Sequence, residues 1–286
     1  MKLVSYDVNG QVRHGRLEGE QITELGSGDL FDLVSGEQDA AGTGTTHNLA
    51  DVRLLAPVRR PGKLLAVAAN YQEHVRESGF DDLDKSRISP RLFLKPSTAI
   101  VGPDADVELP AETPAMDWEA ELVVVIGPSP DGRPCRHVDV EHALDHVYGY
   151  IAGNDISARS LDFGYERDFD DKMVGFFDWL EGKWFDGFAP LGPWLVTADE
   201  IDDPQRLDVG LTLNGEVRQD GNTGAMIFSV AEVIAFASKL MTLEPGDLIM
   251  TGTPSGVGAA TGTFLTAGDE MTVTVQGLGS LTTRVV

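Results

Sequence analysis

The segment "MDWEAELVVVIG", from Met116 to Gly127, combines a buried strand with a row of carboxylates. From Leu122 onward it is a run of aliphatic and β-branched residues, a composition that predicts a buried strand. Ahead of that run, Asp117, Glu119 and Glu121 occupy alternate positions, and alternate residues of a strand project from the same face. Like charges held this close repel one another, and burying an unpaired carboxylate is costly.

Three interpretations of Glu119 and Glu121 follow from the residues alone. They could face solvent from an edge strand, pair with a buried arginine, or bind a hard cation, which takes carboxylate oxygens as ligands. Asp155 favours the third, because in "YGYIAGNDISAR" it follows an apolar strand, and a third carboxylate suits Mg²⁺. Taken alone, Asp155 is more typical of a turn or a helix cap.

A candidate general base lies in "NYQEHVRES", which predicts a short helix from Tyr71 to Ser78. His74 and Glu77 are three residues apart and so share one face of that helix. A carboxylate that orients and charges a histidine makes it a usable base near neutral pH, although such a pair is also common on exposed helices. The charged segment 79–90 predicts a mobile loop that could act as a lid over a site.

Strand patterns dominate the chain and predict an α+β fold with a mainly antiparallel sheet core. Asn9-Gly10 and Asn214-Gly215 are two-residue hairpin signals. The best-signalled helix follows Ser229, which forms a capping box with Glu232. We expect a small β-rich unit over residues 1–62, with an exposed loop at 36–48, and a catalytic domain over 63–286.

Composition restricts the partners and the compartment. The 286 residues include 46 Asp and Glu against 22 Lys and Arg, a net charge of -24 that disfavours nucleic acid and anionic membranes as partners. No stretch has the length of a membrane span, and the N-terminus lacks a signal peptide pattern. The single cysteine, Cys135, lies in a segment that predicts a surface loop, and one cysteine fits a reducing cytoplasm.

Six blocks of this sequence, in order from about Leu64 to the C-terminus, resemble the fumarylacetoacetate hydrolase (FAH) superfamily. They are "NYQEHVRES", "LFLKPSTAIVGP", "MDWEAELVVVIG", "VYGYIAGNDISAR", "GKWFDGFAPLGPWLVT" and "GDLIMTGTPSGVG". The resemblance implies a mixed β-roll in the catalytic domain and a homodimer. It is specific for the superfamily and not for a substrate.

The resemblance also implies roles for eight residues. Glu119, Glu121 and Asp155 match ligands of Mg²⁺, with Mn²⁺ or Ca²⁺ as alternatives, whereas Asp117 lies outside the matching positions, as a residue behind the ligands or facing solvent. His74 and Glu77 match a catalytic dyad, and Lys183 matches a lysine that holds substrate oxygens. Thr253 matches a threonine that contacts the substrate carboxylate, and Lys95 lies near the same pocket.

The implied activity is hydrolysis of the C–C bond of an acylpyruvate-like 2,4-dioxo acid, which gives pyruvate and a carboxylic acid. A small 2-oxo acid is therefore the expected partner. A lyase that decarboxylates or dehydrates a related 2-oxo acid is the alternative, and a scaffold with a dead site is disfavoured by the complete residue set.

Two departures leave the substrate open. Asp162 replaces the glutamine that many members carry three residues after the arginine of "NDISAR". The connection 163–182 is unusually long and aromatic, and its cluster "RDFDDK" predicts a solvated turn. Its aromatic side chains could wall the pocket or serve as core or dimer contacts; they are Tyr165, Phe176, Phe177 and Trp179.

Overall fold

The computed structural model describes residues 1–36 and 41–286, and it confirms an α+β fold dominated by mixed sheets. The largest sheet has 12 strands in the order β4-β3-β2-β1-β14-β12-β11-β17-β6-β7, with β5 on β1 and β8 on β14. A second sheet has the order β16-β15-β18-β19-β9, and β10 pairs with β13 alone. Strand pairs in the described residues are antiparallel except β8 with β14, β17 with β6, and β9 with β19.

The strands of the first half of the chain are β1 Lys2–Val8, β2 Gln11–Glu18, β3 Gln21–Ser27, β4 Thr46–Asn48, β5 Arg53–Leu55, β6 Leu64–Ala68, β7 Arg91–Lys95, β8 Ile100–Val101, β9 Asp106–Val107, β10 Met116–Asp117 and β11 Ala120–Ile126. Those of the second half are β12 Val147–Asn154, β13 Ser157–Ala158, β14 Ala189–Thr197, β15 Asp208–Leu213, β16 Glu216–Asn222, β17 Leu248–Met250, β18 Glu270–Val275 and β19 Gly279–Val285. The helices are α1 Phe31–Val34, α2 Gln72–Glu77, α3 Lys172–Glu181, α4 Val230–Leu240 and α5 Gly258–Thr261.

Strand β11 lies at the centre of the large sheet and is buried on both faces. It pairs with β12 on one side and with β17 on the other. Leu122, Val124 and Ile126 pack into one hydrophobic cluster, whereas Val123 and Val125 pack into another on the opposite face. A strand covered on both faces needs apolar residues at every position, which explains the unbroken aliphatic run.

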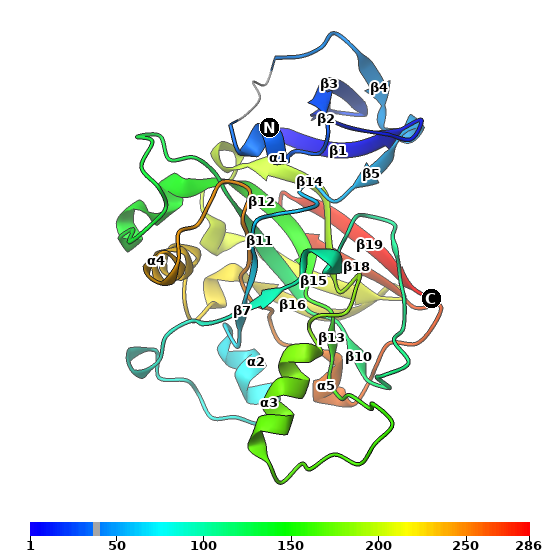
Figure 1. Ribbon diagram of the computed structural model, residues 1–286, viewed down its shortest axis with the longest axis vertical. Coiled ribbons are helices and arrows are strands. Elements are labelled where there is room, and N and C mark those ends of the chain that lie inside the picture. The colour runs from blue at the N-terminus through cyan, green and yellow to red at the C-terminus, as the bar shows by residue number, and fades with distance from the viewer. Residues whose placement is uncertain (37–40) are drawn as a thin grey trace.

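The N-terminal strands continue the large sheet. The β1–β2 hairpin turns at Asn9 and Gly10, whose φ values of 54° and 78° are those a type I′ turn requires. Strand β1 then pairs with β14, so the first unit joins the rest through backbone hydrogen bonds. Figure 1 shows these blue strands at one end of the molecule and α2, α3 and α5 grouped at the opposite end. The division between 1–62 and 63–286 stays a prediction.

Helix α4 confirms its predicted cap. The Ser229 hydroxyl accepts a hydrogen bond from the Glu232 N–H at 3.3 Å, and the Glu232 carboxylate accepts one from the Ser229 N–H at 2.8 Å. These two bonds satisfy amide groups that the first turn of a helix leaves free. No helix among residues 1–36 and 41–286 is long and apolar enough to cross a membrane.

Two local predictions were wrong, and two elements were not predicted. The connection 163–182 contains a helix, α3, whose first turn is capped by the Asp171 carboxylate at the Met173 N–H. Strand β4 lies in the segment predicted to be an exposed loop at 36–48, of which residues 37–40 are outside the described chain. Cys135 is buried, and the backbone around it bridges to Leu243. Strand β19 was not predicted, because its Thr- and Gly-rich sequence lacks a strong apolar signal.

Candidate active site

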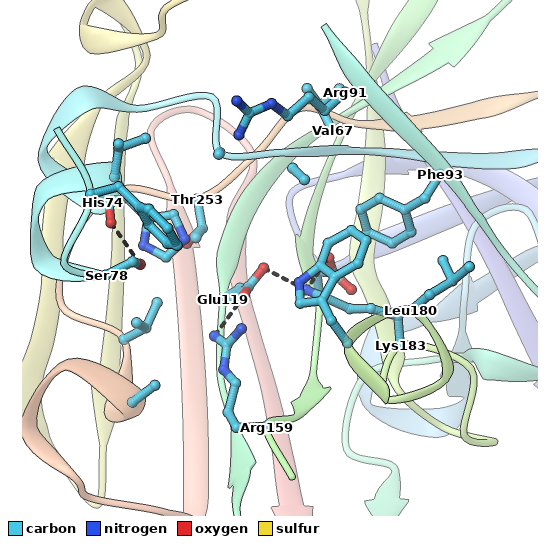
Figure 2. A pocket seen from close by; sticks show the side chains of 18 of the residues that line it. Val67, His74, Ser78, Arg91, Phe93, Glu119, Arg159, Leu180, Lys183 and Thr253 are labelled. Atoms are coloured by element: carbon cyan, nitrogen blue, oxygen red, sulfur yellow. Dashed lines mark hydrogen bonds and ion pairs between the residues drawn. The ribbon is translucent and has the colours of Figure 1, made fainter. Parts of the chain in front are cut away.

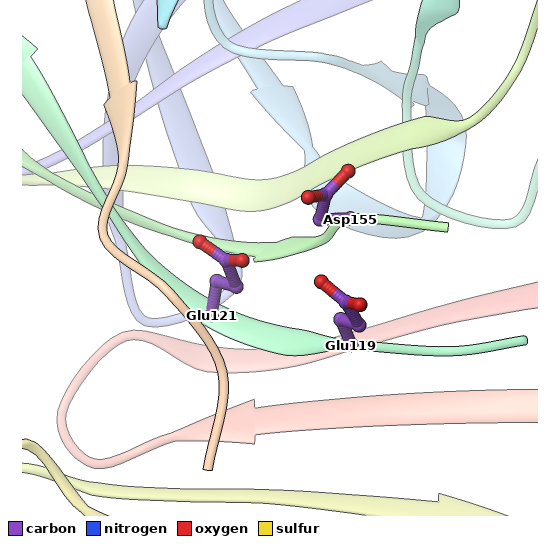
Figure 3. Close-up of side chains that lie close together, drawn as sticks. All are labelled: Glu119, Glu121 and Asp155. Carbon is purple, nitrogen blue, oxygen red and sulfur yellow. The ribbon is translucent and has the colours of Figure 1, made fainter. Parts of the chain in front are cut away.

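Three carboxylates meet where β11 begins and β12 ends (Figure 3). Glu119, Glu121 and Asp155 are buried, and each offers an oxygen within 4.8 Å of those of the other two. Antiparallel pairing produces this arrangement, since Glu121 lies opposite Gly153 and the Asp155 N–H donates to the Glu119 carbonyl at 2.8 Å. Asn154 adds a further tie, because its side-chain oxygen accepts from the Glu119 N–H at 2.9 Å.

Three cationic side chains surround this cluster. Lys183 donates to Glu119 at 2.8 Å and to Asp155 at 2.7 Å, and Lys95 donates to Asp155 at 2.5 Å. Arg159 bonds Glu119 at 2.6 Å. The interpretation that a buried arginine pairs with the carboxylates is thus correct for Glu119, and a solvent-facing edge strand is excluded for both glutamates.

Asp117 has a different role from the other two acidic residues of its segment. It is fully buried and ends β10, a separate short strand, so that the row of carboxylates is interrupted between β10 and β11. Its carboxylate accepts from the N–H groups of Gly258 at 2.6 Å and Ala259 at 3.0 Å, where α5 begins, and from Arg159 at 2.7 Å. The solvent-facing alternative for Asp117 was wrong.

Glu121 is the carboxylate that lacks a cationic partner within the described residues. Its oxygen accepts from the Gly252 N–H at 2.7 Å. Burial, and then the charges of Asp155 and Glu119, raise the pKa of Glu121 well above its usual range. For Glu119, burial opposes ionisation, but Lys183 and Arg159 outweigh it and lower the pKa of that carboxyl.

The charges near the cluster fit a bound divalent cation. When all seven groups are ionised, Asp117, Glu119, Glu121 and Asp155 carry four negative charges, and Lys95, Arg159 and Lys183 carry three positive ones. The one negative charge left over belongs to Glu121, whose carboxylate has no ion-pair partner among residues 1–36 and 41–286. Hard cations such as Mg²⁺ and Mn²⁺ prefer oxygen ligands of this kind, and a cation here would favour the ionised form of Glu121.

His74 and Glu77 form the hydrogen-bonded pair that the sequence predicted. His74 Nδ1 lies 2.7 Å from Glu77 Oε1 on helix α2. The other Glu77 oxygen accepts from the Gly256 N–H at 2.7 Å, so the carboxylate is held from two sides. Because Nδ1 is engaged, Nε2 is the nitrogen of His74 left to exchange a proton with a ligand.

The segment Gly252–Gly256, which we call the glycine-rich loop, connects the two groups. Its first N–H binds Glu121 and its last binds Glu77. Both end glycines have positive φ, 97° and 103°. A Cβ at Gly252 would lie 2.7 Å from the Asn70 Cβ, and one at Gly256 would lie 2.0 Å from the Arg218 carbonyl oxygen. Only glycine fits at these two positions.

A cavity of about 1140 Å³ opens between these groups (Figure 2). Its polar lining includes His74, Glu119, Asp155, Lys183 and Thr253, all of which the sequence singled out. Glu121 and Lys95 do not line it. Lys95 is buried and contacts the cavity only through Asp155, so its predicted contact with substrate stays a prediction.

The aromatic connection contributes part of the cavity wall. Phe176 and Trp179 of α3 line the cavity, and the Trp179 ring meets the ring of Phe93 edge-on with centroids 5.1 Å apart. Tyr165 and Phe177 instead line a smaller surface depression outside it. Asp162 is exposed and accepts from the Gly164 N–H within its own turn. The pocket-wall interpretation is thus correct for two of the four aromatic residues.

Comparisons with known proteins identify the family. The pattern described as "Fumarylacetoacetate (FAA) hydrolase C-terminal" matches residues 63–286, and the one described as "Rv2993c-like, N-terminal" matches residues 1–57. The chain therefore belongs to the fumarylacetoacetate hydrolase family, which confirms the resemblance found in the sequence.

Three relatives illustrate the range of that family. Protein Rv2993c of Mycobacterium tuberculosis is 39% identical over 244 residues, which cover 85% of this chain and 82% of that protein. A solved 5-carboxymethyl-2-hydroxymuconate delta-isomerase from Mycobacterium smegmatis has a TM-score of 0.79 and 35% identity, covering 100% of this chain and 99% of the other. Maleylpyruvate hydrolase from Sphingobium sp. SYK-6, in complex with manganese (II) ion and pyruvate, has a TM-score of 0.73 and 30% identity, with the same coverage. Hydrolases and isomerases thus share this fold.

Replacing Glu121 should abolish stabilisation by metal. In chelator, Glu121→Gln should melt no lower than the wild type, because it removes a buried carboxylate that lacks a counter-ion. Mg²⁺ or Mn²⁺ should raise the melting temperature of the wild type and leave that of the variant unchanged. The rise should shrink as the pH falls, since protons compete for Glu121. Calorimetry tests this, with the exposed Glu141→Gln as control; a full metal response in Glu121→Gln would contradict the ligand assignment.

Replacing Lys183 should destabilise the metal-free protein. Lys183→Met removes one positive charge from beside the buried carboxylates of Glu119 and Asp155. Removing one partner of a buried ion pair lowers the free energy of unfolding by about 3 kcal/mol or more. Urea unfolding in chelator measures the loss, and Lys172→Met, at an exposed position of α3, is the control. Added Mg²⁺ or Mn²⁺ should restore part of the stability. Equal stability of the two variants in chelator would mean that the Lys183 ion pairs contribute little.

Proposed function

We propose that this protein is a divalent-metal-dependent hydrolase, with Mg²⁺ or Mn²⁺ as the cation, that cleaves the C–C bond of an acylpyruvate-like 2,4-dioxo acid. The observation that carries the proposal is that the His74–Glu77 pair, Lys183 and two carboxylates of the acidic cluster line one cavity. A hydrolysis of this type needs a base for water and positive charge for an anionic leaving fragment, and the cavity offers both.

The bound cation would act as a Lewis acid toward the carboxylate and 2-oxo oxygens of the substrate. Lys183 supplies a second positive charge at the same wall of the cavity. Asp155 and Glu119 outweigh the effect of burial and raise the pKa of Lys183, so the ammonium group stays charged at neutral pH. An acidic protein thereby obtains the local positive potential that an anionic substrate requires.

His74 would remove a proton from the attacking water. Its Nδ1 bond to Glu77 orients the ring and stabilises the imidazolium that forms. The water oxygen adds to the 4-oxo carbon, the C3–C4 bond breaks, and its electron pair passes to the pyruvate fragment as an enolate. Protonation at C3 then gives pyruvate, and the acyl fragment leaves as a carboxylic acid, so that one water is consumed.

Product masses separate this proposal from the two competing reactions. Hydrolysis yields two fragments whose masses sum to substrate plus water, decarboxylation releases CO₂, and isomerisation preserves the mass. A panel of acylpyruvates, oxaloacetate and 2-hydroxymuconates, incubated with Mg²⁺ or Mn²⁺, is the direct test. Isomerisation alone would overturn the hydrolase proposal and favour the reaction named for the Mycobacterium smegmatis neighbour. A homodimer and a cytoplasmic location stay predictions beside this proposal.

Loss of His74 should affect hydrolysis much more than decarboxylation. A positioned general base contributes about 10²–10⁴-fold, and His74→Ala should reduce acylpyruvate cleavage by that factor. Decarboxylation of oxaloacetate needs no water and should fall only modestly. Glu77→Gln should give the same pattern more weakly, and the exposed His142→Ala is the control. Equal losses in both reactions, measured on the same preparations, would show that His74 binds substrate or closes the site.

Arg91 marks the part of the cavity where a second anionic group would bind. The other charged residues of the lining pair with one another, as His74 with Glu77, Glu119 with Arg159 and Asp155 with Lys183. Within the described chain, Arg91 has no carboxylate within ion-pairing distance. Arg91 shares one face of β7 with Phe93 and Lys95, and Lys95 contacts Asp155. Four residues of extended strand place Arg91 about 13 Å from Lys95.

Substrates with a distal carboxylate should therefore depend on Arg91. The two enzyme neighbours are named for a muconate and for maleylpyruvate, both of which carry a second carboxylate. Arg91→Met should lower kcat/KM for maleylpyruvate roughly tenfold or more, as expected for a lost bond to a charged group, and leave acetylpyruvate nearly unchanged. Arg87→Met, at an exposed position before β7, is the control. Equal effects on both substrates would contradict a distal carboxylate site.

A further inference from the structure

Gln219 is a buried polar residue on β16 that joins the glycine-rich loop to the strand bearing the carboxylates. Its side-chain oxygen accepts a hydrogen bond from the Ala120 N–H at 2.8 Å. Its nitrogen donates to the Thr253 hydroxyl and to the Pro254 carbonyl, both at 2.8 Å. Ala120 lies between Glu119 and Glu121 in the sequence, so one amide contacts both sides of the site.

The chemistry of these partners fixes the orientation of the amide. A backbone N–H can only donate, so the oxygen of Gln219 must face Ala120. A backbone carbonyl can only accept, so the NH₂ group must face Pro254. The two hydrogens of that group are then assigned, one to Pro254 and the other to Thr253. The reversed amide would place two donors together at Ala120 and two acceptors together at Pro254.

The fixed amide determines what the Thr253 hydroxyl can do. A hydroxyl has one hydrogen to donate and accepts through its lone pairs. Because Gln219 donates to the Thr253 oxygen, the hydroxyl hydrogen is not needed for this contact. No acceptor for that hydrogen lies within hydrogen-bond distance among residues 1–36 and 41–286. Thr253 lines the cavity, so its free hydrogen is available to a ligand.

Packing holds the loop in this position as well. Pro254 lies against Gly221 of β16, where an added Cβ would come within 2.5 Å of the Pro254 Cβ. The loop therefore rests directly on the backbone of β16, next to the strand position from which Gln219 projects. Rotation of the Thr253 hydroxyl away from this arrangement would leave one amide hydrogen of Gln219 buried without an acceptor, which is costly.

We infer that Gln219 is a positioning residue that occupies one lone pair of the Thr253 hydroxyl, directs its hydrogen into the cavity, and thereby favours a carboxylate oxygen over an amide N–H in the ligand. This rests on the proposed function and on the role that the family resemblance implies for Thr253, contact with the substrate carboxylate. Gln219 touches no ligand itself. It was not predicted from the sequence, because a lone glutamine in a strand pattern is ordinary and its partners lie 99 and 34 residues away.

The test compares two probes that differ only in the group facing Thr253. Binding of pyruvate and of pyruvamide is measured by calorimetry with saturating Mn²⁺, for the wild type, Gln219→Met, Thr253→Val and the double variant. The wild type should prefer pyruvate. Gln219→Met should reduce that preference roughly tenfold, because the hydroxyl can then rotate and accept from the carboxamide. Mn²⁺ binding without the probes should be unchanged, and the exposed Gln21→Met is the control.

The double-mutant cycle decides whether Gln219 acts through Thr253. In the Thr253→Val background, Gln219→Met should change the preference by less than about twofold, since coupled residues are not additive. Gln219→Glu keeps an acceptor for the Ala120 N–H, and its second oxygen accepts the Thr253 hydroxyl hydrogen. This variant should therefore also lose the preference for pyruvate over pyruvamide. It serves as the second variant if Gln219→Met does not fold. An unchanged preference in the Gln219 variants, or a fully additive cycle, overturns the inference alone. Failure of the Mn²⁺-loaded wild type to bind pyruvate overturns the proposed function with it.

Discussion

The interaction on which this site depends is the repulsion among buried carboxylates at the junction of β11 and β12. Antiparallel pairing brings Glu119, Glu121 and Asp155 together, and all three side chains are buried, which limits the screening of their charges by water. Lys95, Arg159 and Lys183 offset most of that repulsion and leave Glu121 unmatched. The same imbalance that would weaken a purely structural core would favour the binding of a cation.

Much of the fold and of the site could be predicted from local sequence. The β11 run, the Asn9-Gly10 turn and the Ser229 cap are short-range signals whose physical causes lie within a few residues. The His74–Glu77 pair is likewise local, because both residues share one helix face. Among the three interpretations of Glu119, Asp155 favoured a bound cation and the family resemblance decided for it. The structure shows that an arginine pair and a carboxylate cluster coexist there.

What could not be predicted depends on contacts between distant segments. Asp117 follows the same alternation as Glu119 and Glu121 in the sequence. The strand is interrupted between β10 and β11, however, and the Asp117 side chain turns toward α5. Cys135 has polar neighbours in sequence but is covered in the fold by a segment more than a hundred residues later. Helix α3 was missed because its interior mixes aromatic residues with glycine, and its exposed face gives no apolar period.

The glycine-rich loop has a further consequence, because its length constrains the distance between Glu121 and Glu77, the two carboxylates that its ends contact. One end is tied to a carboxylate of the acidic cluster and the other to the partner of the histidine, so the number of residues between Gly252 and Gly256 sets how far apart these groups stand. Because the loop makes both contacts through backbone N–H groups, the distance that it sets does not depend on the side chains that α3 and β7 contribute to the cavity. The side chains that α3 and β7 contribute to the cavity wall can therefore change while the spacing of these two groups stays constant. A single insertion or deletion within this loop would alter that spacing for every substrate at once.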